Sequence, residues 1–157
     1  MKKNKGQFLI ETLIALAASI LIISGLVTAV TSAVKNAQFS KNQALATKYA
    51  TEGMEWVRSQ RDQNWSTFYP LSTTSSPGNR YCISTLPTST WPSTNACGTS
   101  DYISGPSSAT VFKREVLLFT EPATLPEIKI KATITVSWSD AGGNHKSNLE
   151  SYFTNWQ

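Results

Sequence analysis

The chain has 157 residues, enough for one globular domain, with 14 Lys and Arg, 10 Asp and Glu, one His and a net charge of +4. Lys2, Lys3 and Lys5 lie in the first six positions, and the 14 basic residues less these three leave 11 against 10 acidic ones. This near balance argues against a dedicated nucleic-acid-binding protein. One histidine and no Ser/His/Asp or Cys/His arrangement argue against an enzyme. We therefore expect no catalytic residues, no cofactor and no metal site.

Residues 8–34 form an apolar run of 27 residues whose only charged side chain is Glu11. A run of this length and composition predicts a helix that spans a lipid bilayer. The basic residues before it favour a cytoplasmic N-terminus, so we expect a single-pass protein of the cell (inner) membrane with the remainder outside. A removable secretory signal is disfavoured because its apolar core is usually about 7–15 residues long. A permanent signal anchor, with Glu11 reaching to the interface, is the alternative.

Residues 35–65 continue the helical pattern but become amphipathic. No proline occurs before Pro70, and no turn signal separates this segment from the apolar run. We predict one continuous helix over about residues 8–64, roughly 85 Å long at the rise of an α-helix. Its outer half should pack on a small head, and its inner half on lipid or on other copies. The predicted buried stripe consists of Phe39, Ala46, Tyr49, Ala50, Gly53, Met54, Trp56 and Val57.

Residues 66–110 have the composition of a loop, because 20 of these 45 residues are Ser or Thr. We predict a surface-lying connection with one or two short strands. Cys82 and Cys97 lie in it, beyond the predicted membrane span. In an exported domain such a pair most often forms a disulfide, which we predict here, with two free thiols as the alternative.

The C-terminal segment predicts an antiparallel sheet. Residues 111–119 are rich in strand formers without clean alternation, whereas residues 127–138 alternate strictly. Residues 140–144 are a turn cluster, and residues 146–156 can return as a partner strand with Leu149 and Phe153 on the core side. The predicted buried face of the alternating strand consists of Ile128, Ile130, Ala132, Ile134, Val136 and Trp138.

The fold class is therefore α+β, with a long N-terminal helix, membrane-spanning and then amphipathic, packed on a small C-terminal antiparallel sheet. The predicted organisation is a leader at 1–6, a membrane-spanning half of the helix at 7–34, an amphipathic half at 35–65, a Ser/Thr/Pro-rich connection at 66–109 and the sheet at 110–157.

The start of the apolar run reads Lys5-Gly6-Gln7-Phe8-Leu9-Ile10-Glu11. It resembles the prepilin cleavage and methylation motif of type IV pilin-like proteins, a basic leader ending in glycine and a glutamate fifth after the cut. The resemblance implies the type IV pilin fold, cleavage between Gly6 and Gln7 by a prepilin peptidase, N-methylation of Gln7 and a role for Glu11 in assembly. Residues 50–58, 61–65 and 136–145 also resemble segments of PilV-like minor pilins.

The function that this resemblance implies is that of a structural subunit, a minor pilin of a type IV pilus acting in filament initiation, at filament tips or in adhesion. The implied partners are other pilin subunits, the prepilin peptidase, the pilus assembly platform in the membrane, and membrane lipid before assembly. Two alternatives stay open. One is a pseudopilin of a type II secretion or DNA-uptake system. The other is a signal-anchored surface binding protein that never polymerises.

Two weaker candidate sites remain. A DNA-contacting patch would need five basic residues on one surface, but lysines on a strand more often serve solvation and edge protection, so nucleic acid is not expected as a partner. Asp140 and Asn144 offer two oxygen ligands, which are too few for a calcium site and are explained by a hairpin turn. The five basic residues are Lys113, Arg114, Lys129, Lys131 and Lys146.

Overall fold

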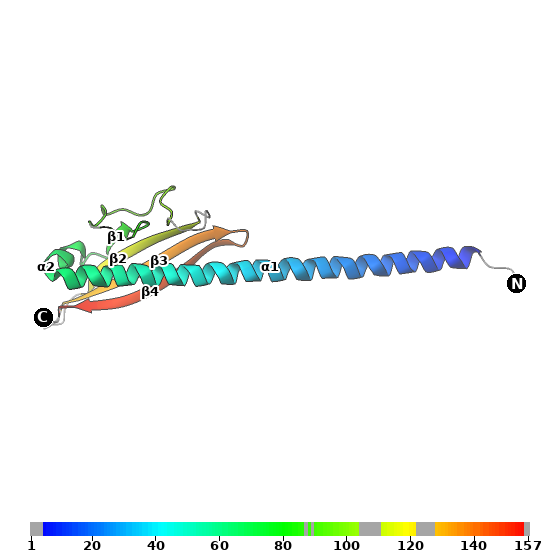
Figure 1. Cartoon of the computed structure of the whole chain (residues 1–157), viewed down its shortest axis with the longest axis horizontal. Coiled ribbons are helices and arrows are strands. Elements are labelled where there is room, and N and C mark those ends of the chain that lie inside the picture. Colours follow the sequence, from blue (N-terminus) through cyan, green and yellow to red (C-terminus); the bar gives the residue numbers. More distant parts are fainter. Residues whose placement is uncertain (1–4, 87, 89, 104–110, 122–127, 156–157) are drawn as a thin grey trace. The chain divides into compact units, whose positions relative to one another are not determined.

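The computed structural model describes residues 5–86, 88, 90–103, 111–121 and 128–155. Its elements in chain order are the helix α1 (Lys5–Gln63), the helix α2 (Trp65–Phe68), the 3-10 turn η1 (Tyr69–Leu71) and the strands β1 (Asn79–Cys82), β2 (Phe112–Glu121), β3 (Lys129–Asp140) and β4 (Gly143–Thr154) (Figure 1). The chain divides into two compact units, residues 1–41 and residues 42–157.

The described part of the first unit is helical throughout, as the sequence predicted, and belongs to the single helix α1. Five of the six hydroxyl side chains within the apolar run donate to carbonyl oxygens of the preceding turn, as Ser19 Oγ does to Ala15 O at 2.8 Å and Thr28 Oγ1 to Ser24 O at 2.9 Å. A polar side chain satisfied within its own helix costs little in lipid. These serines and threonines are therefore compatible with a membrane span.

The second unit contains a four-stranded antiparallel sheet in the order β1-β2-β3-β4. The strands β3 and β4 form a hairpin in which Asp140 pairs with Gly143, leaving Ala141 and Gly142 at the turn. The backbone of Gly143 has a φ of 118°, a conformation that favours glycine. The part of α1 in this unit lies across one face of the sheet (Figure 1).

The core of the second unit lies between that helix segment and the inner face of the sheet. The alternation predicted for β3 is confirmed, because its residues Ile130 to Trp138 at every second position are buried. The predictions for Phe39 and Ile128 are wrong, since these side chains are 42% and 38% exposed. Ile128 lies before the first residue of β3. The fully or nearly buried helix residues are Ala46, Ala50, Gly53, Met54, Trp56 and Val57.

The strand β2 also alternates strictly between buried and half-buried positions, although its sequence shows no clean alternation. Polar residues account for the difference, because Arg114 and Thr120 occupy inward positions. They share the inner face with Phe112, Val116 and Leu118. The burial period was therefore hidden from a pattern of apolar residues alone.

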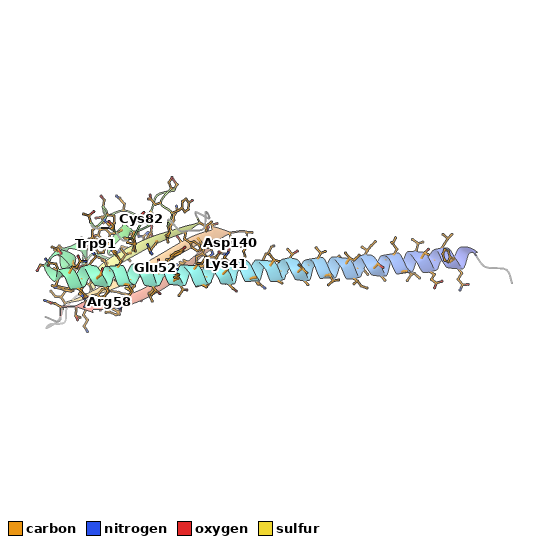
Figure 2. The ribbon with its side chains drawn as sticks, viewed as in Figure 1. Lys41, Glu52, Arg58, Cys82, Trp91 and Asp140 are labelled. Atoms are coloured by element: carbon orange, nitrogen blue, oxygen red, sulfur yellow. A yellow bond between two sulfur atoms is a disulfide. The ribbon has the colours of Figure 1, made fainter. Side chains whose placement is uncertain are left out.

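The Ser/Thr-rich connection contributes more to the fold than a surface loop would. The prediction of one or two short strands in this connection is confirmed by β1, at residues 79–82, so the sheet begins well before residue 110. The helix α2 and the turn η1 were not predicted. The predicted disulfide between Cys82 and Cys97 is confirmed. The indole of Trp91 contacts the rings of Trp56 and Tyr81, with centroids 4.6 and 5.2 Å apart. Cys82 and Trp91 are labelled in Figure 2.

Candidate functional site: the N-terminal apolar helix

The Gly6–Gln7 peptide bond lies in the first turn of α1, and both residues are exposed. The first turn of a helix has N–H groups without intrahelical partners, and glycine there lowers the helix propensity by about 1 kcal/mol relative to alanine. A Cβ atom built on Gly6 would find no described atom within 4 Å. The bond is therefore open to solvent at a helix end that unwinds easily.

Gln7 and Glu11 lie one helical turn apart on the same side of α1. They line one shallow surface groove, together with Ile10, Ile14 and Ala18. Glu11 is exposed, and none of the ion pairs found among the described residues involves it. The structure thus brings together the three positions, Gly6, Gln7 and Glu11, that the sequence singled out.

The apolar side chains around this site are exposed along the whole first half of α1. Leu21, for example, is 73% exposed, and the helix is long and apolar enough to cross a membrane by its length and composition. Exposed apolar surface of this extent is rare on monomeric soluble proteins. The large exposed residues of this segment are Phe8, Leu9, Ile10, Leu13, Ile14, Leu16, Ile20, Leu21, Ile22, Ile23, Leu26, Val27, Val30 and Val34.

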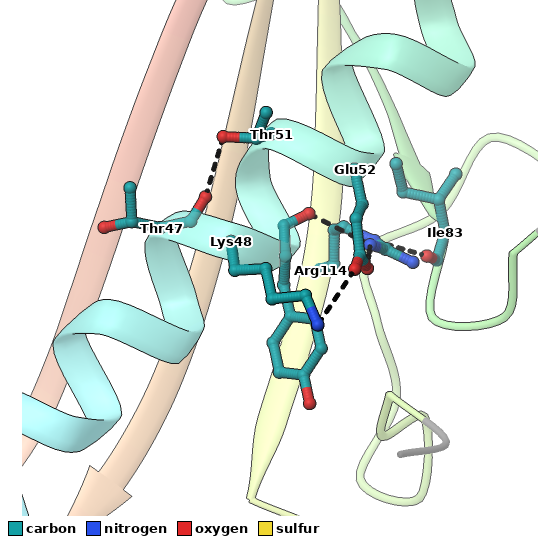
Figure 3. Close-up of polar contacts among 7 residues, drawn as sticks. Thr47, Lys48, Thr51, Glu52, Ile83 and Arg114 are labelled. Atoms are coloured by element: carbon teal, nitrogen blue, oxygen red, sulfur yellow. Dashed lines mark hydrogen bonds and ion pairs between the residues drawn. The ribbon is translucent and has the colours of Figure 1, made fainter. Parts of the chain in front are cut away.

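A second polar constellation surrounds Arg114, whose side chain is 2% exposed (Figure 3). Its Nε donates to the carbonyl oxygen of Ile83 at 3.0 Å, and its Nη1 donates to that of Tyr49 at 2.9 Å. Nη1 also lies 3.6 Å from the Glu52 carboxylate, which is 47% exposed. Burial lowers the pKa of Arg114, and the charge of Glu52 opposes that shift. The guanidinium therefore ties β2 to the helix and to the segment after β1.

Burial of Arg114 removes it from the weak candidate for a DNA-contacting patch, because the side chain is not available at the surface. Lys131 is paired with Glu150 at 2.9 Å. Lys113 donates to the carbonyl oxygen of Gly98 at 2.6 Å and lies 5.1 Å from the centre of the Tyr102 ring. The five basic residues therefore do not form one surface patch.

The Asp140 carboxylate stabilises the turn between β3 and β4 by hydrogen bonds. Its Oδ1 accepts a hydrogen bond from the N–H of Gly142 at 2.7 Å and lies 2.9 Å from Nε2 of His145. These contacts, the Gly142 bond first, lower the pKa of Asp140. Among the described residues, no group of three or more His, Cys, Asp or Glu side chains is placed to hold a metal ion.

The role of Arg114 was not predicted from the sequence, and neither was its fit to Gly53, where an added Cβ would lie 2.9 Å from Arg114 Cδ. The spacing along β2 could have indicated its burial, because Arg114 lies an even number of residues from Phe112, Val116 and Leu118 and so faces the same side of the strand. Comparisons of the chain with family models, with curated proteins and with solved structures found no match.

Proposed function

We propose that this chain is a structural subunit, and a minor one, of a type IV pilus or a related extracellular filament. It is held in the membrane by the apolar half of α1 with its N-terminus inside. A prepilin peptidase cuts between Gly6 and Gln7, the new N-terminus at Gln7 is methylated, and the helix then packs with other pilin subunits at the assembly platform. The role is structural and involves no catalysis.

The observation that carries this proposal is the position of Glu11. It is the only charged side chain in residues 8–34, and it lies one turn beyond Gln7 on the same side of the helix. A carboxylate enclosed by lipid or by apolar helices is costly unless it is paired. Cleavage after Gly6 creates an amine about 6 Å along the helix from Glu11. While the leader is attached, the Gln7 nitrogen belongs to a peptide bond and cannot pair with Glu11 as a cation. Cleavage must therefore precede assembly.

The division of the chain supports this reading. The second unit has its own apolar core, its own sheet and a disulfide, and the described first unit is a single exposed helix. A helix whose apolar surface is covered by nothing within its own unit needs lipid before assembly and neighbouring helices after it. We take those neighbours to be the equivalent helices of other subunits.

The test compares the wild type with Glu11→Val, Glu11→Gln and Gly6→Leu in the membrane and in sheared filaments. Both Glu11 variants should be cut normally, remain in the membrane and enter filaments poorly. Gly6→Leu should accumulate as precursor. Wild-type incorporation of Glu11→Val would remove the basis of the proposal.

Mass spectrometry of the N-terminal peptide separates the proposal from a permanent signal anchor, which would keep Met1. Quantitative proteomics of sheared filaments tests the minor role, and finding this chain as the dominant subunit would contradict it.

A further inference from the structure

Gln7 differs chemically from an apolar residue at the new N-terminus, because its side chain ends in an amide. The proposed cleavage would free an amine on the same residue. Gln7 is exposed, and it borders the groove that also contains Glu11. We propose that Gln7 is a modification site at which the freed amine closes on the side-chain amide to form a five-membered lactam. This inference rests on the proposed cleavage after Gly6.

The reaction needs no cofactor, oxidant or reductant. The neutral α-amine nitrogen attacks Cδ of the Gln7 side chain, so the N–Cδ bond forms and the Cδ–Nε2 bond breaks. The side-chain nitrogen leaves as ammonia and takes the proton that the amine gives up. In the precursor the same nitrogen belongs to the Gly6–Gln7 peptide bond and is not nucleophilic. The leader therefore blocks the reaction until it is removed.

Two electrostatic effects favour the lactam over the ammonium. A cation at the N-terminus of α1 faces the positive end of the helix dipole. The neighbouring side chains Phe8 and Ile10 are apolar and exposed, so the ammonium would be carried into lipid or against other helices, where charge is costly. The lactam carries no charge and avoids both effects.

Glu11 acts in the opposite direction. A carboxylate about one turn away stabilises the protonated amine, which cannot attack Cδ. At a separation of about 6 Å, in surroundings with the dielectric constant of water, the attraction corresponds to a factor of about three in the protonation equilibrium. The factor is larger where water is scarce. Glu11 therefore slows ring closure by favouring the protonated amine, until the amine is methylated or paired.

Lactam formation has a direct consequence for assembly. The lactam nitrogen is an amide, so it neither accepts a methyl group as an amine does nor offers Glu11 a cation. A subunit that cyclises should stay in the membrane, while subunits with an intact amine enter filaments. Gln7 thus sets a time limit between cleavage and assembly.

The experiment uses the full-length protein in cells, with heavy-isotope reductive methylation of all free amines at the moment of lysis. This labelling prevents ring closure after lysis and is distinguished by mass from methylation in the cell. The N-terminal peptide is then measured in membranes and in sheared filaments at increasing times after synthesis. Gln7→Phe is cut but cannot form the ring, and Glu52→Gln is a matched removal of a carboxylate elsewhere in α1.

An unlabelled peptide that begins at residue 7 and has lost one ammonia should accumulate with time in the membrane fraction and be depleted in filaments. Glu11→Gln should raise its rate of formation about threefold or more, and Glu52→Gln should leave the rate unchanged. If every peptide begins at Gln7 and carries the label or a cellular methyl group at all times, lactam formation is refuted while the proposed function stands. If peptides still begin at Met1 or Lys2, the proposed function fails as well. If Glu11→Gln does not raise the rate of lactam formation, the proposed effect of Glu11 on the amine is refuted.

Discussion

Arg114 offers the sharpest test of what holds the second unit together. Two explanations of its burial are open to experiment. Either the guanidinium is held mainly by its hydrogen bonds to the carbonyl oxygens of Ile83 and Tyr49, or it is held mainly by the charge of Glu52. The geometry favours the first, because both carbonyl contacts are about 3 Å long and the carboxylate is farther away and half exposed.

The magnitudes follow from these contacts. Arg114→Met keeps most of the aliphatic volume but removes both donors. The Ile83 carbonyl then loses its donor, at a cost of about 1–3 kcal/mol, whereas the Tyr49 carbonyl lies inside α1 and keeps the hydrogen bond of the helix backbone. Part of that cost is offset because the charged group no longer has to be buried. We expect a net loss of about 1–2 kcal/mol for Arg114→Met. Arg114→Ala adds a cavity and should lose about 3–5 kcal/mol. Glu52→Gln removes only a solvent-screened partner and should cost about 1 kcal/mol or less.

The assay is urea-induced unfolding of the full-length protein in a non-ionic detergent, followed by tryptophan fluorescence. Trp56 and Trp138 are buried in the second unit and report on its unfolding. Added salt should weaken the effect of Glu52→Gln and leave that of Arg114→Met nearly unchanged. If Glu52→Gln destabilises the protein as much as Arg114→Met, the ion pair and not the carbonyl contacts holds Arg114, and the reasoning is refuted.

Three further predictions concern the same unit. Gly53→Ala should lower its stability by about 1–3 kcal/mol in that assay, although alanine is the better helix former, because the new Cβ would lie 2.9 Å from Arg114 Cδ and 3.4 Å from Ile134 Cγ2. Gly25→Ala is the control, since its Cβ would meet no described atom within 4 Å, and equal effects of the two changes would contradict the packing argument. Replacing Cys82 and Cys97 by serine should cost about 3 kcal/mol for a loop of this size, and complete alkylation of both cysteines in the native, unreduced protein would show that the bridge is absent. The contacts from Gly142 N–H and His145 hold the pKa of Asp140 below its ordinary value of 3.8, so the stability they provide is present above that value and is lost as the pH falls through the lower folded pKa. The thermal midpoint should therefore fall less between about pH 5 and about pH 2.5 for Asp140→Asn than for the wild type, and identical pH profiles would rule this contribution out.

The candidate site could be predicted from the sequence because it is local. Gly6, Gln7 and Glu11 lie within six positions, and any helix places residues 7 and 11 on one side. The apolar run, the continuous helix and the alternation of β3 were likewise predictable, since each depends on a spacing between neighbours along the chain. The disulfide was predictable because the chain has only two cysteines.

What keeps Arg114 buried on the inner face of β2 could be known only from the tertiary structure. Arg114 is charged, and local pattern assigns a charge on a strand to the solvent. Its partners are the carbonyl oxygens of Ile83 and Tyr49, which are 31 and 65 positions away, so only the folded chain supplies them. The sequence predicted one or two short strands in the Ser/Thr-rich connection, and tertiary structure decided where they form: β1 pairs with β2, and Trp91 contacts Trp56. The alternation of β2 places Arg114 on the inward side, but whether a charged group can stay buried there depends on distant backbone groups that satisfy it, and the sequence does not identify those groups.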